Sequence, residues 1–153
     1  MLTLRPLTAV DDSFMLALYL HSRDYELAQL PWDDAQKEAF LTMQYHQQRQ
    51  AYQQQYPQAE WSIVVWEGQD VGRLIVEQRP SEIGLMDITI APEWRNKGFG
   101  SQVIQQVMQR ATAVNLPVRL YVDVSNHAAV RLYQRLGFTI FEANEVDYRM
   151  TFG

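Results

Sequence analysis

Residues 95–101 read Arg-Asn-Lys-Gly-Phe-Gly-Ser, and the rest of the chain is organised around this stretch. It follows an apolar, β-branched run at residues 85–90 that is typical of a buried strand. Apolar residues recur after it at helical spacing, namely Phe99, Val103, Val107, Met108 and Ala111. A helix that begins at a glycine pair, just after basic residues, presents free backbone N–H groups and the positive end of its dipole. The stretch therefore predicts an anion-binding site.

The composition is that of an ordinary globular chain. With 153 residues, 47% of them hydrophobic and 20% charged, we expect one domain over residues 1–153. The formal net charge of −5 argues against nucleic acid as a partner and favours a basic one.

The absence of cysteine and the residues at the start of the chain limit the kinds of binding site and of cellular location that we expect. There is no cysteine, which excludes disulfides and thiolate metal ligands, and the three histidines show no metal-ligand spacing, so we expect no metal. The start of the chain lacks the apolar core of a signal peptide, and no stretch approaches the ~20 apolar residues of a membrane span. We expect a cytoplasmic protein with no membrane partner.

The first part of the chain predicts a strand and two helices. Residues 2–7 alternate as a strand, and Pro6 indicates that this strand ends there or lies at a sheet edge. A helix follows from caps at residues 8–12 to about Ser22. A second, long helix is expected to start at Asp33 or Asp34, with Glu38 as capping-box partner.

Eight glutamines lie between residues 44 and 58, interleaved with three tyrosines. We interpret them as the solvated face of the second helix, with a binding surface as the alternative. Two apolar runs at residues 61–66 and 71–77, separated by turn residues, then predict a hairpin that leads into the strand at 85–90.

Beyond the central helix the pattern predicts a strand, a short helix and a final pair of strands. Residues 118–124 alternate as a strand, which should run parallel to 85–90 because one helix separates the two. A short helix follows from Asn126 to about Gly137, and residues 138–141 and 146–152 form a final strand pair. The predicted fold is α/β, with a mixed, mostly antiparallel sheet of about seven strands and helices on both faces.

Two motifs in this order of elements are specific. The first is Arg95-x-x-Gly98-x-Gly100, and the second is Asn126 followed by Ala128-Ala129 and Leu132-Tyr133-x-x-Leu136-Gly137-Phe138. Both resemble motifs of the GNAT superfamily of acetyl-CoA-dependent N-acetyltransferases, and the resemblance covers essentially the whole chain. A dinucleotide site fits less well, because the third small residue of that fingerprint is missing.

The resemblance implies that the protein transfers an acetyl group from acetyl-CoA to a primary amine, by direct attack and without a covalent enzyme intermediate. In this family the backbone of the glycine loop holds the CoA pyrophosphate, and free strand amides hold the pantetheine and the acyl carbonyl. The residues so implied are Thr89, Ile90, Arg95, Asn96, Lys97, Gly98, Phe99, Gly100, Ser101, Asn126 and Tyr133, with Ala91 as a further strand amide.

The catalytic residues are also implied by the resemblance. Tyr133 corresponds to a tyrosine that protonates the departing thiolate, although an aromatic core anchor is its alternative. The usual glutamate base would fall at Gly84, so the chain departs from the family pattern there. Asp87 is the nearest strand carboxylate and the candidate base, but alternation places it on the opposite face from Gly84 unless a bulge intervenes. A structural hydrogen-bonding role is its alternative.

Acceptor binding in the resembled family involves the connection between the first two helices and the closing hairpin. Tyr25 and Glu26 are the candidate acceptor contacts here, since carboxylates with aromatics suit an ammonium group. Other polar residues of these loops are also candidates, with helix capping or solvation as the alternative: Trp32, Asp33, Asp34, Glu142, Asn144, Glu145 and Asp147. A non-catalytic acyl-CoA-binding or regulatory module remains the alternative function, and the protein is expected to be a monomer or a homodimer.

Overall fold

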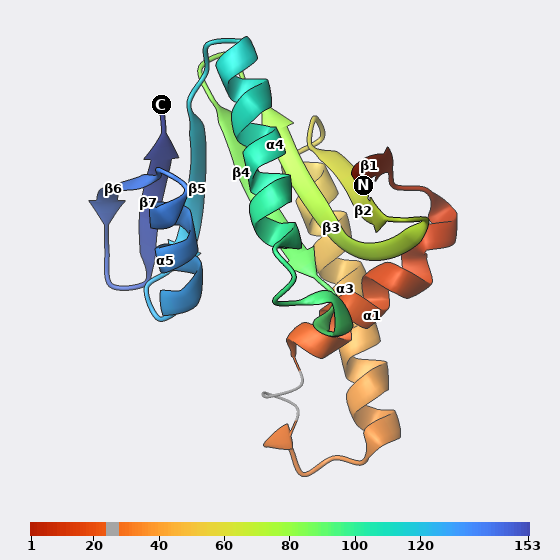
Figure 1. Ribbon diagram of the computed structural model, residues 1–153. Helices are drawn as coiled ribbons and strands as arrows, with labels where there is room; N and C mark the ends of the chain where they lie inside the picture. The colour runs from red at the N-terminus through yellow and green to blue at the C-terminus, as the bar shows by residue number, and fades with distance from the viewer. Residues whose placement is uncertain (24–27) are drawn as a thin grey trace.

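The structure, a computed structural model, describes residues 1–23 and 28–153 (Figure 1). Its strands are β1 (Leu2–Pro6), β2 (Glu60–Trp66), β3 (Gln69–Gln78), β4 (Ile83–Ile90), β5 (Val118–Asp123), β6 (Thr139–Ala143) and β7 (Asp147–Phe152). Its longer helices are α1 (Asp12–Ser22), α3 (Asp34–Gln55), α4 (Phe99–Ala113) and α5 (His127–Arg135). Two 3-10 turns, η1 (Ala9–Asp11) and η2 (Pro92–Trp94), precede α1 and α4.

The strands form one sheet in the order β1-β2-β3-β4-β5-β7-β6. Every neighbouring pair is antiparallel except β4 and β5, which run parallel on either side of the α4 crossover. The predicted mixed, mostly antiparallel sheet is confirmed, as is the edge position of the strand that contains Pro6.

Helices cover both faces of the sheet, as predicted. On one face, α1 and α3 enclose a core cluster of Met15, Tyr19, Leu41, Tyr45 and Ile63. On the other face, the apolar side of α4 packs on the inward residues of β3, β4 and β5, and α5 joins the same cluster. In Figure 1, α4 and α5 lie in front of the sheet and α3 lies behind it. Burial of each large apolar side chain stabilises these contacts by about 1.5–3 kcal/mol.

The start of α3 differs from the prediction in one detail. Asp33 is the N-cap, and its Oδ1 accepts a hydrogen bond from the Gln36 backbone N–H at 2.8 Å. Gln36 closes the capping box by accepting from the Asp33 backbone N–H at 3.1 Å. The expected partner Glu38 was wrong, because the reciprocal bond requires the third helical position.

The closing hairpin places its second strand inside the sheet. β7 pairs with both β5 and β6, so that Met150 is fully buried, whereas every residue of β6 is exposed. No helix within residues 1–23 and 28–153 has the length and apolarity needed to cross a membrane.

Candidate active site

Strands β4 and β5 separate soon after they begin. They pair only at Ile83 with Val118 and at Gly84 with Arg119, although β4 continues to Ile90 and β5 to Asp123. Figure 1 shows the two strands diverging toward the end of the sheet at which α4 and α5 begin. The later residues of β4 therefore present an edge without a strand partner on the β5 side, and we call this opening the β4–β5 gap.

The direction of the β4 amides follows from one hydrogen bond. The Ala91 N–H donates to the Val71 carbonyl on β3 at 2.8 Å, so the expectation of a free amide at Ala91 was wrong. Amide directions alternate along an antiparallel strand. The amide of Thr89 consequently also faces β3, so the expectation of a free amide there was wrong as well, whereas the amides of Ile88 and Ile90 face the β4–β5 gap.

The glycine loop leads into α4 with its amides unpaired. Among the described residues, none of the backbone N–H groups from Asn96 to Ser101 donates a hydrogen bond to a protein acceptor, and the first bond at this helix start runs from Gln102 to the Gly98 carbonyl. Residues 95–98 are exposed. Consecutive free amides at a helix N-terminus form a concave set of donors for an anion.

The two glycines of this loop serve different purposes. Gly98 is the N-cap of α4 with φ +81°, a conformation that L side chains rarely adopt. Gly100 lies inside the helix without a positive φ, and a Cβ added there would meet no atom within 4 Å. Neither backbone strain nor protein packing requires glycine at position 100, and the space above it is open to a ligand. The loop therefore fits a phosphate group that approaches the backbone closely.

The side chains of the glycine loop have different surroundings. Phe99 is 5% exposed and packs between Trp66 and Trp94, with ring centroids 5.1 and 6.1 Å away, so that only its backbone faces outward. The Arg95 Nε donates to the Ile90 carbonyl at 3.1 Å and so ties the loop to the end of β4. Lys97 is exposed.

The second motif forms the start of α5. Asn126 is the N-cap, and its Oδ1 accepts a hydrogen bond from the Ala129 backbone N–H at 3.2 Å. Its capping role is therefore established, and a contact to a cofactor stays a prediction. Since α5 follows β5 directly and α4 follows β4, both helices begin near the open end of the gap (Figure 1).

Tyr133 lies on the α4 and α5 side of the sheet. Its ring packs edge-on against Phe138 with centroids 5.6 Å apart, and it belongs to the surrounding core cluster. Burial, and secondarily the negative charge of Asp87, raise the pKa of the Tyr133 hydroxyl to about 12. The phenol is therefore neutral and protonated at ordinary pH, and Asp87 lies within electrostatic range of it.

A bulge in β4 decides where Asp87 points. Asp87 pairs with Ile75, but Leu85 pairs with Val76, so Met86 is an extra residue in the strand. Alternation restarts after the bulge, and Asp87 therefore faces the α3 side together with Gly84. Regular alternation would place Asp87 and Gly84 on opposite faces, and the bulge places them on the same face. Asp87 and Tyr133 thus approach the β4–β5 gap from opposite faces of the sheet.

The carboxylate of Asp87 has two partners. Arg73 Nε lies 2.7 Å from Oδ2, and the Thr89 hydroxyl donates to the same oxygen at 3.1 Å. Thr89 thus points its side chain to the same face of the sheet as Asp87. The side chain of Asp87 is 31% exposed, and its Oδ1 accepts no hydrogen bond from the residues described.

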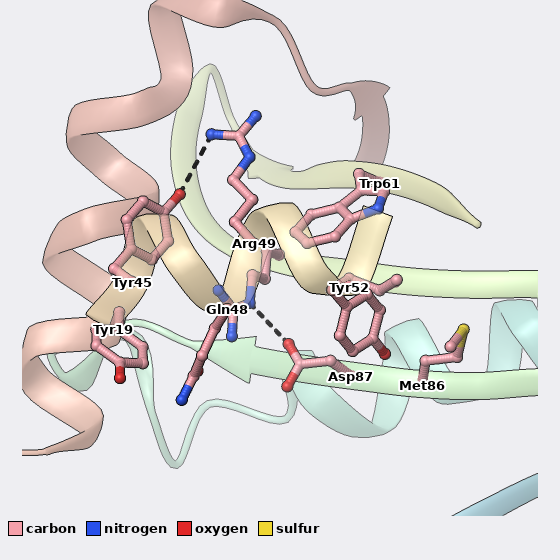
Figure 2. Close-up of a pocket in the computed structure, with 10 residues that line it drawn as sticks. Tyr19, Tyr45, Gln48, Arg49, Tyr52, Trp61, Met86 and Asp87 are labelled. Atoms are coloured by element: carbon pink, nitrogen blue, oxygen red, sulfur yellow. Dashed lines mark hydrogen bonds and ion pairs between the residues drawn. The ribbon is translucent and has the colours of Figure 1, made fainter. Parts of the chain in front are cut away.

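Asp87 lines a cavity of about 210 Å³ between α3 and the sheet (Figure 2). Its walls are mainly aromatic and polar side chains from α1, α3 and the sheet, namely Tyr19, Tyr45, Gln48, Arg49, Tyr52, Trp61, Arg73, Ile75 and Met86. Figure 2 shows Asp87 between Gln48 and Tyr52. Burial first, and then the charge of Asp87, raise the pKa of Tyr52 to about 12. This space, which we call the acceptor cavity for the role proposed below, is large enough for a small organic group beside the carboxylate.

The guanidinium of Arg79 lies over Gly84, the position at which the resembled family has its glutamate base. A Cβ at Gly84 would lie 2.9 Å from Nη2 and 3.0 Å from Cζ of Arg79, so the guanidinium covers the glycine. Glu77 holds this arginine in place, with Oε1 2.5 Å from Nε. Position 84 is a glycine and therefore supplies no carboxylate of its own.

Two expected acceptor contacts, Tyr25 and Glu26, lie outside the described residues. Of the other loop candidates, Asp33 caps α3, and the Asn144 side chain accepts from the backbone amides of Val146 and Asp147, both at 2.7 Å. For Asp33 and Asn144 the alternative of a local structural role is therefore confirmed.

Sequence reasoning missed most of the acceptor cavity. Tyr45 and Tyr52, one heptad apart on α3, do carry a detectable signal, because this spacing puts them on one helical face. Arg73 and Trp61 carry none, since their approach to Asp87 depends on the pairing of β2 with β3 and of β3 with β4.

The chain is similar to known proteins in sequence and in fold. The Acetyltransferase (GNAT) family matches residues 24–138. Over 58 residues the chain is 38% identical to a mycothiol acetyltransferase from Nocardiopsis dassonvillei, a match that covers 37% of this chain but only 18% of that relative.

Solved structures share the fold over almost the entire chain. An N-acetyltransferase, PaiA, from Thermoplasma acidophilum, in complex with coenzyme A, has a TM-score of 0.73 at 15% identity, with 99% of this chain and 98% of that chain covered. The spermidine/spermine N-acetyltransferase SpeG from Vibrio cholerae has a TM-score of 0.65 at 24% identity, with 99% and 94% covered. With three quarters of its length inside the family match, the chain belongs to the GNAT family of acetyltransferases.

Proposed function

We propose that this protein is an N-acetyltransferase that moves the acetyl group of acetyl-CoA to a primary amine. The observation that carries the proposal is the β4–β5 gap, which opens beside the unpaired amides of residues 96–101 and between Asp87 and Tyr133. Family membership supports acyl transfer in general. The N-acetyl specificity and the roles below are the proposal.

The pyrophosphate of acetyl-CoA binds the amides from Asn96 to Ser101, with Gly100 allowing the backbone to approach and Lys97 adding positive charge. The pantetheine arm follows the β4–β5 gap, where the amides of Ile88 and Ile90 are its donors. This path leads the thioester from the α4 side of the sheet toward Asp87.

The acceptor amine occupies the acceptor cavity. The free Oδ1 of Asp87 takes the proton that the amine must lose, while Arg73 and Thr89 hold the other carboxylate oxygen. The amine nitrogen then attacks the acetyl carbon and the carbon–sulfur bond breaks. An amide of β4 that faces the gap stabilises the carbonyl oxygen.

Tyr133 acts on the sulfur. Its pKa of about 12 lies above the ~8.5 of an ordinary thiol, so complete proton transfer to the thiolate is uphill. The phenol therefore donates a hydrogen bond that strengthens as charge develops on sulfur, and the thiolate takes its final proton from solvent.

The test combines binding with turnover. Calorimetric titration of acetyl-CoA into the wild type should show one site, and Gly98→Glu should abolish it, whereas Lys37→Gln on α3 serves as a surface control. Thiol release in the presence of a panel of primary amines then measures transfer. Equal binding by wild type and Gly98→Glu would overturn the site assignment.

The alternative of a non-catalytic module has one supporting observation, the arginine over Gly84 where a base is usual. Binding of acetyl-CoA without thiol release for any amine would favour the module. Release of thiol with formation of the acetylated amine, identified by mass spectrometry, would exclude it.

A further inference from the structure

A second cavity adjoins the acceptor cavity and has a different chemistry. It has a volume of about 160 Å³, and Tyr52 and Met86 line both cavities. The charged residues that line it are Arg79, Glu82, Arg119 and Arg149. Three cations and one carboxylate thus surround this space, which we call the arginine cavity, although the protein as a whole has a net charge of −5.

Arg119 is the least satisfied of these cations. Its Nε is buried and has no hydrogen-bond partner among the described residues. Its Nη1 forms a long ion pair with Oε1 of Glu82 at 3.8 Å, which is beyond hydrogen-bond distance. A buried donor without a partner costs about 1–3 kcal/mol, so its presence calls for an acceptor that the chain itself does not supply.

Arg149 and Arg119 both contact the ring of Phe141. The Cζ of Arg119 is 5.0 Å and the Cζ of Arg149 is 5.1 Å from the centroid of the Phe141 ring. Arg149 pairs with Glu142 at 2.8 Å. Both guanidinium groups therefore lie at one ring and line one cavity, where an anion would be attracted to both and a cation would be repelled.

Arg79 does not compete for such an anion. It already binds Glu77 at 2.5 Å and Glu82 at 3.2 Å. Its two carboxylate partners leave Arg119, assisted by Arg149, as the cation that is available to a ligand.

We propose that the acceptor carries an anionic group, a carboxylate or a phosphate, that binds Arg119 while its amine lies at Asp87. This deepens the proposed function and rests on it. Gly84, which pairs with Arg119, precedes Asp87 by three residues, but one of them is the bulge at Met86, so the two positions are about 7 Å apart along the strand. An acceptor with its amine and its anion at opposite ends of an extended chain fits both cavities at once, whereas a polyamine would place a cation against the arginines.

The test uses ω-amino acids of increasing chain length, each matched with the alkylamine and the diamine of the same length. Thiol release should favour the ω-amino acid at one intermediate length by roughly tenfold to hundredfold in kcat/KM. Arg119→Gln should remove that preference without changing kcat/KM for the alkylamine. Arg135→Gln, an exposed arginine on α5 outside both cavities, should behave as wild type.

A length series of ω-phosphonate amines, run in parallel, identifies which anion is preferred. Equal rates for ω-amino acids, phosphonates and alkylamines, with no effect of Arg119→Gln, would overturn the inference while leaving N-acetyl transfer intact.

Failure of the proposed function gives a different pattern. If no amine is acetylated, calorimetric titration with the matched alkyl carboxylates and phosphonates, which lack the amine, still reports on the arginine cavity. Binding to the wild type that Arg119→Gln weakens at least about tenfold would support the anion site. No binding of any of these anions to the wild type would overturn it.

Discussion

The Nε atom of Arg73 on β3 lies 2.7 Å from Oδ2 of Asp87 on β4. The bulge at Met86 turns Asp87 to the α3 face, where Arg73 and Thr89 hold one carboxylate oxygen and leave the other toward the acceptor cavity. The ion pair therefore orients the candidate base. The sequence left two roles open for Asp87, as a base and as a structural hydrogen-bond acceptor. Oδ2 has the structural role, and Oδ1 is the oxygen that the proposed base would use.

Asp87→Asn should lower kcat by roughly 10²–10⁴, because the amide cannot take a proton. Arg73→Gln keeps the carboxylate and removes its anchor, so its loss should be smaller. Both variants should lose no more than about 1 kcal/mol of unfolding free energy, since the pair is partly exposed. Thiol-release kinetics and thermal unfolding measure the two effects. A fall in kcat that is equal for both variants and parallels their stability would assign Asp87 a structural role.

Tyr133→Phe should lower kcat by roughly 10²-fold or more while acetyl-CoA binds with unchanged affinity. Stability should change little, because no hydrogen bond from the hydroxyl to a described residue is lost. The pKa of Tyr133 is about 12, so the wild-type phenol keeps its proton through neutral and mildly alkaline pH, and its ionisation should cause no loss of rate below about pH 10. Retention of full activity by Tyr133→Phe would remove the phenol from the mechanism.

Gly100→Ala should move stability and affinity in opposite directions. The free energy of unfolding without ligand should rise by about 0.5–1 kcal/mol, because alanine is favoured over glycine inside a helix and the new Cβ meets no protein atom. The dissociation constant for acetyl-CoA should rise about tenfold, equivalent to about 1.4 kcal/mol, since the Cβ occupies the space assigned to the pyrophosphate. Denaturant unfolding and calorimetry provide the two readouts. Unchanged affinity in the stabilised variant would place the cofactor elsewhere.

Protonation of the Asp11 carboxylate should account for a measurable part of the unfolding free energy that the protein loses in acid. It is buried, accepts hydrogen bonds from Arg5 at 2.7 and 2.9 Å and from the Thr8 backbone at 2.9 Å, and these bonds lower its pKa from 3.8 to about 2. A lowered folded-state pKa contributes stability that is present above about pH 4 and is lost as the pH falls toward 2.

Asp11→Asn should therefore cost about 2 kcal/mol at pH 7, and the difference from wild type should disappear near pH 2. Urea unfolding across this pH range measures the effect. The exposed Asp34 on α3 provides the control, and Asp34→Asn should change stability by less than about 0.5 kcal/mol. A difference that persists undiminished at pH 2 would attribute the loss to packing rather than to the ionised carboxylate.

The elements and the glycine loop were predictable because their signals are local. Apolar periodicity, the caps at Asp33 and Asn126, and the glycine at position 98 all act through neighbours a few residues away. The capping partner Gln36 was missed although the signal is local, because Glu38 was assigned to the wrong helical position.

The acceptor side of the site was not predictable in the same way. Arg73 and Trp61 reach the acceptor cavity, and Arg119 reaches the arginine cavity, through strand pairings between residues that are far apart in the chain. The amide of Ala91 was expected to be free, but its bond to Val71 depends on the same long-range register.

The sequence by itself determined the order of helices and strands, the glycine start of α4 at which an anion site is predicted and, through its two motifs, the family. Only the tertiary structure decided that β4 and β5 part after two residue pairs, that a bulge turns Asp87 toward the acceptor cavity, and that Arg119 is left without a hydrogen-bond partner for its Nε among the residues described. The physical reason is that helix starts and strand patterns arise from contacts along the chain, whereas a gap, a bulge and an unpaired charge are set by register between distant strands.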